Sequence, residues 1–147
     1  MTDVEFMGQH TPRLDEKGRL FLPARFREGL GESVVVTKGM DRCLTIYPHA
    51  VFKERILNHL NAASSASRNV RQMRRALLAN ASTETPDRQG RVTIPAVLRE
   101  FAGLDRECVV IGQGHYVEVW DAPTFAAVDA DSDAVLDALD EEGVVLL

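Results

Sequence analysis

The sequence contains the same fourteen-residue pattern twice. Residues 15–28 read DEKGRLFLPARFRE, and residues 87–100, seventy-two positions later, read DRQGRVTIPAVLRE. Seven of the fourteen positions are identical, and three others exchange one apolar side chain for another. An internal repeat of this kind indicates one supersecondary unit used twice, so we expect two pseudo-symmetric half-units in one body.

Length and composition are those of an ordinary globular protein. The chain has 147 residues, of which 45% are hydrophobic and 27% charged, and this suffices for a core without disulfides or metals. No apolar run reaches the roughly 18 residues of a membrane helix. Asp3 and Glu5 stand where an export signal is basic. We therefore expect a cytoplasmic protein with no membrane contact and no small-molecule substrate.

The two cysteines and four histidines are scattered. Cys43 and Cys108 lie in apolar segments of strand length, and no His or Cys follows a metal-ligand spacing. The pattern favours buried free thiols, and it predicts neither a metal site nor a cofactor.

Charge is distributed unevenly along the chain. All 17 basic residues precede Asp121, whereas eight of the 22 acidic residues lie at or after it. The net charge of −5 therefore divides into +3 for residues 1–120 and −8 for residues 121–147. A basic body beside an acidic segment favours contact with nucleic acid, although the acidic part alone is also typical of a solvated tail.

Each copy of the pattern predicts a turn, a strand and a short helix. Asp and Gly at positions 15 and 18, and again at 87 and 90, suit a tight turn, because Asp bonds nearby backbone groups and Gly adopts a positive φ. Alternating apolar residues then predict a strand that leaves a hairpin, and the proline after it begins a helix. A second hairpin follows in each copy. The predicted turn residues are Asp15, Gly18, Asp87 and Gly90.

These elements predict a mainly β protein with accessory helices, of α+β class. We expect a first module at 9–51, a helical connector at 52–79, a second module at 80–123 and an acidic C-terminal tail at 124–147. The tail keeps weak helical periodicity but is crowded with aspartate. A loosely held helix or a disordered segment is therefore expected there.

Basic side chains gather around the turns. Arginine forks and lysine charges bind phosphates, and arginine also reads guanine in the major groove. The first copy is richer in such residues than the second, so it is the stronger candidate. The predicted DNA-contacting residues are Arg13, Lys17, Arg19, Arg25, Arg88 and Arg91.

A purely structural role explains the same arginines. Asp15 stands four residues before Arg19, and Asp87 four residues before Arg91. An ion pair inside each turn would hold the turn together without any partner. The residues alone leave both roles open for Arg19.

The doubled DxxGR turn, the Pro-Ala and Arg-Glu pairs that follow it, and the aromatic end of each unit resemble the MraZ family of bacterial regulators, which carries two SpoVT-AbrB-like modules. The resemblance runs from about Phe6 to Phe125 and includes the connector segment 69–79. It implies two swapped-hairpin half-units forming one β-barrel, assembled into a ring-like homo-oligomer. By motif match, the family's DNA-contacting arginine falls on Arg19, with Arg91 as its counterpart.

The resemblance also implies binding to short repeated DNA sites upstream of a division and cell-wall gene cluster that includes the protein's own gene. We expect a sequence-specific, nucleoid-associated regulator whose partners are double-stranded DNA and other copies of itself. The alternative is an antitoxin-like interaction module of the AbrB type, in which the acidic tail would suit a basic partner. An enzyme is not expected, because no nucleophile–base pair, metal-ligand spacing or phosphate loop is found.

Overall fold

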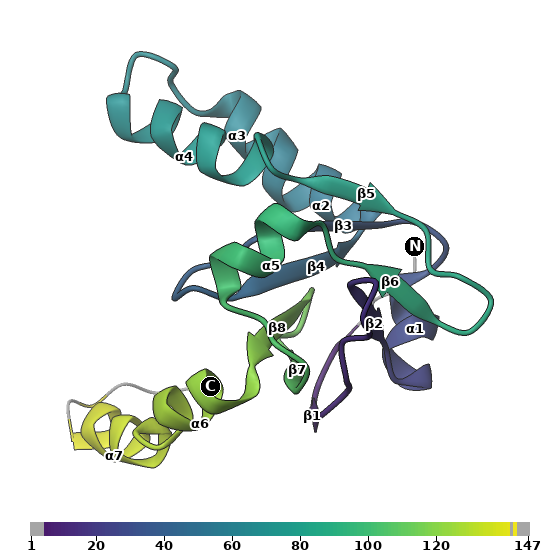
Figure 1. Cartoon of the computed structure of the whole chain (residues 1–147). Helices are drawn as coiled ribbons and strands as arrows, with labels where there is room; N and C mark the ends of the chain where they lie inside the picture. The colour runs from purple at the N-terminus through teal and green to yellow at the C-terminus, as the bar shows by residue number, and fades with distance from the viewer. Residues whose placement is uncertain (1–4, 142, 144–147) are drawn as a thin grey trace.

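The computed structural model describes residues 5–141 and 143. The fold is mixed α/β and is built on a six-stranded antiparallel sheet and a separate two-stranded ribbon (Figure 1). Across the sheet the strands follow the order β1 (Gln9–His10), β7 (Cys108–Gly112), β8 (Val117–Asp121), β4 (Leu44–Pro48), β3 (Val34–Lys38) and β5 (Ser82–Glu84). The ribbon pairs β2 (Arg19–Phe21) with β6 (Arg91–Thr93).

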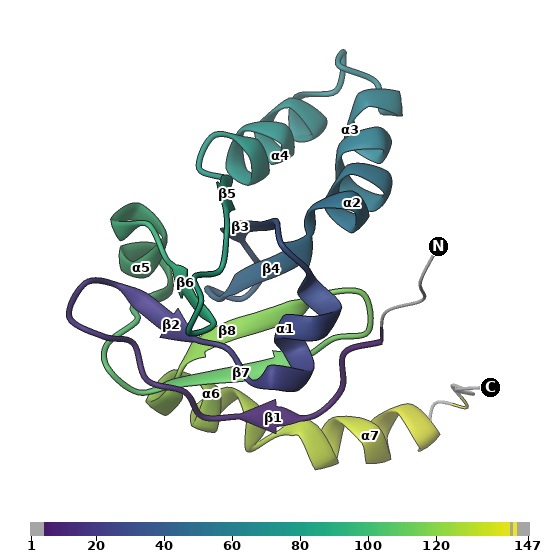
Figure 2. The same cartoon turned by 90° about the vertical axis from the view of Figure 1, so that its right-hand side faces the viewer.

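The helices fall into three groups. Within the described residues, no helix is long and apolar enough to cross a membrane. One short helix follows each ribbon strand, a helical hairpin projects from one end of the sheet, and two helices close the chain at the other end (Figures 1 and 2). In chain order the helices are α1 (Ala24–Leu30), α2 (His49–Phe52), the π-helical turn η1 (Lys53–Leu57), α3 (Asn58–Ala62), α4 (Arg68–Leu78), α5 (Ala96–Ala102), α6 (Ala122–Asp129) and α7 (Ser132–Glu141).

The two sequence copies are interleaved. β1, which opens the first copy, pairs with β7 of the second, and β5, which opens the second copy, pairs with β3 of the first. β4 and β8 join the copies at the centre of the sheet. In the ribbon, β2 and β6 are equivalent strands, and Leu20 lies opposite Val92 at the middle of the pair. Each copy therefore completes its sheet with strands from the other.

The expectation of one closed β-barrel is wrong. The sheet is open and ends at β1 and β5, and the ribbon forms a sheet of its own. The ribbon strands have three residues each, and α1 and α5 begin directly after Pro23 and Pro95. To close a barrel, the ribbon strands would have to pair with both edge strands of the sheet. Strands of three residues are too short to do so.

The opening hairpin is also different from the predicted one. The segment before the first turn forms β1 and isolated bridges such as Arg13–Glu107, and it meets β2 only through the bridge Leu14–Leu20. Most of its pairing is with the second copy, because β7 offers a longer edge than β2.

The main core lies between the ribbon and the sheet. Leu20, Leu22, Val92 and Ile94 point inward from the ribbon, and all four are at most 3% exposed. Phe26 of α1 lies in the same apolar cluster. Burial of each such side chain stabilises the fold by about 1.5–3 kcal/mol. The inner face of the ribbon is thereby held on the protein, and its outer face is left toward solvent.

Candidate nucleic-acid interface

Each repeat turn is closed by its aspartate. Asp15 Oδ1 accepts hydrogen bonds from the backbone N–H groups of Lys17 and Arg19, both at 2.9 Å, and Asp15 Oδ2 accepts one from Arg19 Nε at 2.7 Å. Gly18, at φ +77°, completes the turn by donating to the Asp15 carbonyl. The first turn is therefore a rigid loop with an arginine fixed at its exit.

The second turn repeats this geometry. Asp87 Oδ1 accepts from the backbone N–H groups of Gln89 and Arg91 at 2.9 and 2.8 Å, and Asp87 Oδ2 accepts from Arg91 Nε at 2.7 Å. Gly90 has a φ of +80°. Hydrogen bonding of this kind favours the charged carboxylate. The backbone N–H of the paired arginine is the largest cause that lowers the pKa of Asp15 and of Asp87.

The outer face of the ribbon brings the two arginines together. Side chains alternate along a strand, so Arg19 and Phe21 of β2 share this face with Arg91 and Thr93 of β6. Phe21 is 47% exposed, and Arg91 Cζ lies 6.0 Å from the centre of its ring. Arg91 Nη1 also lies 3.9 Å from Asp15 Oδ2. We call Arg19, Phe21, Arg91 and Thr93 the ribbon face.

Each turn rests on an arginine from the opposite copy. A Cβ atom at position 18 would fall 2.7 Å from Cζ and Nη1 of Arg99, and one at position 90 would fall 2.5 Å from Nε of Arg27. The carbonyl of Gly18 accepts a hydrogen bond from the backbone of Ile94 in the second copy, at 2.8 Å. The turns therefore need glycine for space as well as for φ, and α5 and α1 support them.

Arg27 and Arg99 are equivalent residues of the repeat, and their environments match. In both, Nε is buried and has no hydrogen-bond partner among the described residues. An unsatisfied buried donor costs about 1–3 kcal/mol. Both guanidinium groups pack on a glycine turn, and the arrangement occurs once in each half.

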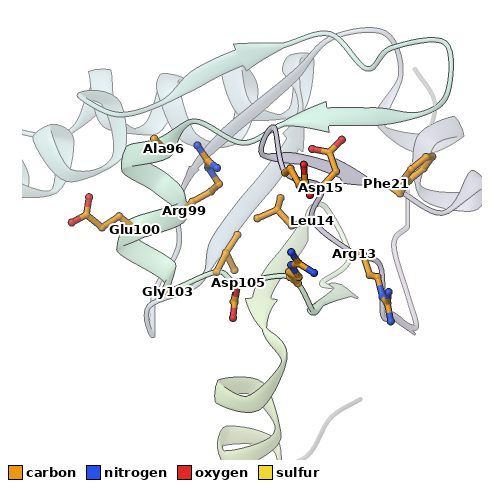
Figure 3. A pocket seen from close by; sticks show the side chains of 12 residues that line it. Arg13, Leu14, Asp15, Phe21, Ala96, Arg99, Glu100, Gly103 and Asp105 are labelled. Atoms are coloured by element: carbon orange, nitrogen blue, oxygen red, sulfur yellow. The ribbon is translucent and has the colours of Figure 1, made fainter.

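A hollow opens beside the contact between the first turn and α5 (Figure 3). Arg99 and Glu100 line it from α5, and Asp15 and Phe21 line it from the turn and the ribbon. A smaller hollow at the equivalent place separates the second turn from α1. The described residues contain no cluster of His, Cys, Asp or Glu that would hold a metal ion. Both turns stand out from the surface beside these hollows.

The remaining predicted residues are distributed around the ribbon. Lys17 and Arg88 are exposed at the two turn tips. Arg13 is exposed and lines the same hollow as Phe21. Arg25 is exposed on α1, where its Nη2 donates to the Met7 carbonyl at 3.3 Å. The structure thus places Arg19 and Arg91 on one face, Lys17 and Arg88 at its ends, and Arg25 against the N-terminal segment.

Four residues of this region were missing from the predicted set. Alternation along 19–22 already placed Phe21 beside Arg19, and the same pattern places Thr93 beside Arg91. Arg27 and Arg99 are identical at equivalent positions of the repeat. That identity was the available sign of a shared structural role, although nothing local showed that each packs on the turn of the other copy.

Comparison with known proteins gives consistent matches over nearly the whole chain. The family model described as "MraZ protein, putative antitoxin-like" matches residues 6–76 and again residues 77–146. A protein of Thermobifida fusca (strain YX) named "Transcriptional regulator MraZ" is 53% identical over 137 residues, which cover 93% of this chain and 95% of that protein.

Two further proteins with the same printed name match similarly. The protein of Micrococcus luteus is 47% identical over 137 residues, covering 93% of this chain and 95% of the relative. The protein of Salinispora arenicola (strain CNS-205) is 48% identical over 140 residues, covering 95% of this chain and 97% of the relative.

Proposed function

This chain belongs to the MraZ family, and from that premise we propose that it is a transcriptional regulator that binds double-stranded DNA sequence-specifically through the ribbon face. The observation that carries the proposal is the pairing of β2 with β6, which brings Arg19 and Arg91 onto one exposed surface beside Phe21. Relatives that are about half identical to the chain are named transcriptional regulators.

A two-stranded ribbon has the width to enter the major groove. Asp15 and Asp87 each hold the Nε of an arginine. Both Nη groups of Arg19 are then free, among the described residues, to donate to a guanine edge in a bidentate manner, whereas Nη1 of Arg91 also lies 3.9 Å from Asp15 Oδ2. The Phe21 ring suits an apolar contact with a thymine methyl group. In this arrangement the ribbon face reads bases.

The turn tips supply phosphate contacts. Lys17 and Arg88 project at the two ends of the ribbon, where the DNA backbones flank an occupied groove. Arg13 and Arg25 extend the basic surface beyond the first turn. These contacts would position the protein on the duplex but carry no sequence information.

One copy of the chain offers few uncompensated positive charges. The ion pairs within the turns neutralise part of the charge of Arg19 and Arg91, so each copy would displace few counterions and bind weakly. Several copies on one assembly gain affinity through effective concentration. The proposal therefore includes a ring-like homo-oligomer that binds short repeated sites.

By the family resemblance, the proposed sites lie upstream of the division and cell-wall gene cluster that contains the protein's own gene. The proposed location is the cytoplasm, on the nucleoid. No step of this function requires a cofactor.

The test compares Arg19→Ala with Arg75→Ala. Both variants lose one positive charge, but Arg75 is an exposed residue of α4 in the helical hairpin. Binding to DNA from upstream of the protein's own gene is measured by fluorescence anisotropy at two salt concentrations. We expect Arg19→Ala to lower affinity by about 5- to 150-fold if Arg19 makes a bidentate base contact, since such a contact contributes about 1–3 kcal/mol. Arg75→Ala should bind like the wild type.

The same measurement separates base contact from phosphate contact. A base contact relaxes the preference at one position of the site, whereas a phosphate contact reduces the salt slope by about one unit. Equal isotherms for wild type and Arg19→Ala would reject the ribbon face as the interface.

A second candidate function is an antitoxin-like interaction module, which the description of the matching family model favours. Such a protein should co-elute with a small basic protein and lose it when α7 is deleted. Deletion from residue 132 onward keeps α6, whose Phe125 packs against Trp120. Retention of the partner without α7 would count against this function.

A further inference from the structure

The acidic helix α7 carries an apolar stripe without a partner. Val135 and Leu136 are 54% and 55% exposed, and at 100° per residue they share one side of the helix with Leu139. Asp133 and Asp137 lie along one edge of this stripe. None of the three buried clusters of the described residues includes an α7 side chain. A ten-residue helix is marginal in water by itself, so a docking surface is needed to hold it.

A groove with the complementary properties lies at the other end of the molecule. It lies among α4, η1, the tip of the β3–β4 hairpin, α5 and the start of β8, and its volume is about 560 Å³. Tyr47 and Tyr116 stack at 4.8 Å within it. Met40 and Met73 line the groove and are 75% and 40% exposed. Methionine side chains adapt to irregular apolar partners, so this groove is suited to receive a helix.

Lys38 lines the groove, and Arg42 stands beside it on a strained turn at the tip of the β3–β4 hairpin. Lys38 Nζ and Arg42 Cζ lie 4.8 and 5.0 Å from the centre of the Phe101 ring, which also lines the groove. Asp41 and Arg42 have φ values of +61° and +62°, and such residues cost about 1–2 kcal/mol each when they are not glycine. Strain of this size is concentrated at functional sites.

Two acidic side chains also line the groove. Glu118 is engaged, because its Oε1 accepts from Trp120 Nε1 at 3.0 Å and from Gln113 Nε2 at 3.2 Å. Asp41 lies at the turn, between Met40 and Arg42. Among the described residues no ion pair joins Lys38 or Arg42 to a carboxylate, so both cations remain available beside Phe101.

We propose that α7 of one copy docks into this groove of the next copy. Val135, Leu136 and Leu139 would enter the groove as the anchors of an amphipathic helix. Asp133 and Asp137 would then face Lys38 and Arg42. We assign the occupant to a second copy, since α4, which forms one wall of the groove, lies at the end of the molecule opposite α7 in both views (Figures 1 and 2).

The contact is head-to-tail, because two different surfaces of the chain meet. Repetition of such a contact produces a closed ring when the rotation between copies allows closure. No residue of β2 or β6 lines the groove or belongs to α7. Docking therefore leaves the ribbon face free, and it specifies the subunit contact within the proposed homo-oligomer on which it rests.

The test uses two exposed positions, one on each surface. Leu136→Glu puts a charge on the stripe, and Met40→Glu puts one in the groove. Met7→Glu is the control, since Met7 is 61% exposed and belongs to neither surface. Mass is measured by size-exclusion chromatography with light scattering in the absence of DNA. We expect each test variant to fall to the mass of one copy, while Met7→Glu keeps the mass of the wild type.

Mixing the two test variants distinguishes a head-to-tail contact from any other. Leu136→Glu retains an intact groove and Met40→Glu retains an intact helix, so an equimolar mixture should form one good interface and the mass of two copies. Wild-type mass in either variant alone, or no two-copy species in the mixture, would overturn the docking. Circular dichroism checks that both variants remain folded.

The outcomes separate this contact from the other proposals. A wild type with the mass of one copy would overturn both the docking and the ring, whereas DNA binding through the ribbon face is judged from Arg19→Ala alone. A wild type that is monomeric until a basic protein is added would favour the antitoxin-like module. If the docking is right, Leu136→Glu should lose about 100-fold affinity for repeated sites and keep its affinity for a single site.

Discussion

Gly18→Ala tests the packing between the two copies with a single methyl group. Gly18 has a φ of +77°, and a Cβ atom there would fall 2.7 Å from Arg99 Cζ. The left-handed backbone costs an L-residue about 1–2 kcal/mol. Displacement of the guanidinium from its packed position adds about 1–2 kcal/mol, at the low end for overpacking because the end of an arginine can move. The expected loss is about 2–4 kcal/mol.

Gly103→Ala supplies the matched control. Gly103 has a φ of +62°, but no atom lies within 4 Å of a Cβ built there. It should lose only the backbone term of about 1–2 kcal/mol. For a chain of this size, each kcal/mol lowers Tm by about 2–4 °C. Gly18→Ala should therefore melt about 4–16 °C below the wild type and Gly103→Ala about 2–8 °C below it, so at any one conversion factor Gly18→Ala melts lower.

The assay is thermal unfolding by circular dichroism at one protein concentration, because assembly makes Tm depend on concentration. A double variant, Gly18→Ala with Arg99→Ala, measures the coupling directly. Removal of Arg99 makes room for the methyl group, so the double variant should lose less stability than the sum of the two single variants. Equal losses in Gly18→Ala and Gly103→Ala, with additive behaviour in the double variant, would show that Arg99 does not support the turn.

Three further results are expected. The lowered pKa values of Asp15 and Asp87 mean that their contribution to stability is present above the ordinary value of 3.8 and is lost as the pH falls through the folded-state value; the variant with Asn at both positions should show a flatter decline of stability in acid titration. Burial raises the pKa of Cys43 to about 12 and of Cys108 to about 11, so Ellman's reagent at about pH 8 should react with neither thiol until the protein unfolds. Leu20→Ala, at a fully buried position in the ribbon, should lose about 2–5 kcal/mol in urea titration, and a loss below about 1 kcal/mol would contradict the burial of the inner face.

The features that follow from local chemistry were predicted well. α4, Arg68–Leu78, lies within the segment 52–79 that was expected to be helical, and the short helix expected after Pro23 is α1. Alternation, proline at a helix start and the Asp-x-x-Gly turn act over a few residues, so one sequence is enough to recognise them. The repeat itself predicted that β2 and β6 would be equivalent.

The pairing of the strands was beyond the reach of the same patterns. A strand with one apolar face can pair with its neighbour in the chain or with the equivalent strand of the other copy, and both choices bury the same side chains. The choice depends on edge length and on where the prolines stop the strands, which are properties of the assembled sheet. Alternation alone placed Phe21 beside Arg19, but its position opposite Arg91 follows only from the pairing of β2 with β6.

Divergence between the two copies makes the ribbon face asymmetric. A dimer of single modules presents identical side chains on both strands of its ribbon, so it matches a site with two-fold symmetry. In this chain the two strands have diverged: Phe21 and Thr93 occupy equivalent positions, as do Lys17 and Gln89. The two arginines keep the approximate symmetry, while the apolar contact exists on one side only and the tip cations, Lys17 and Arg88, occupy non-equivalent positions. If the ribbon face binds DNA as proposed, it should distinguish the two directions of a site without two-fold symmetry. Inverting one of several repeated sites should then weaken binding to the array.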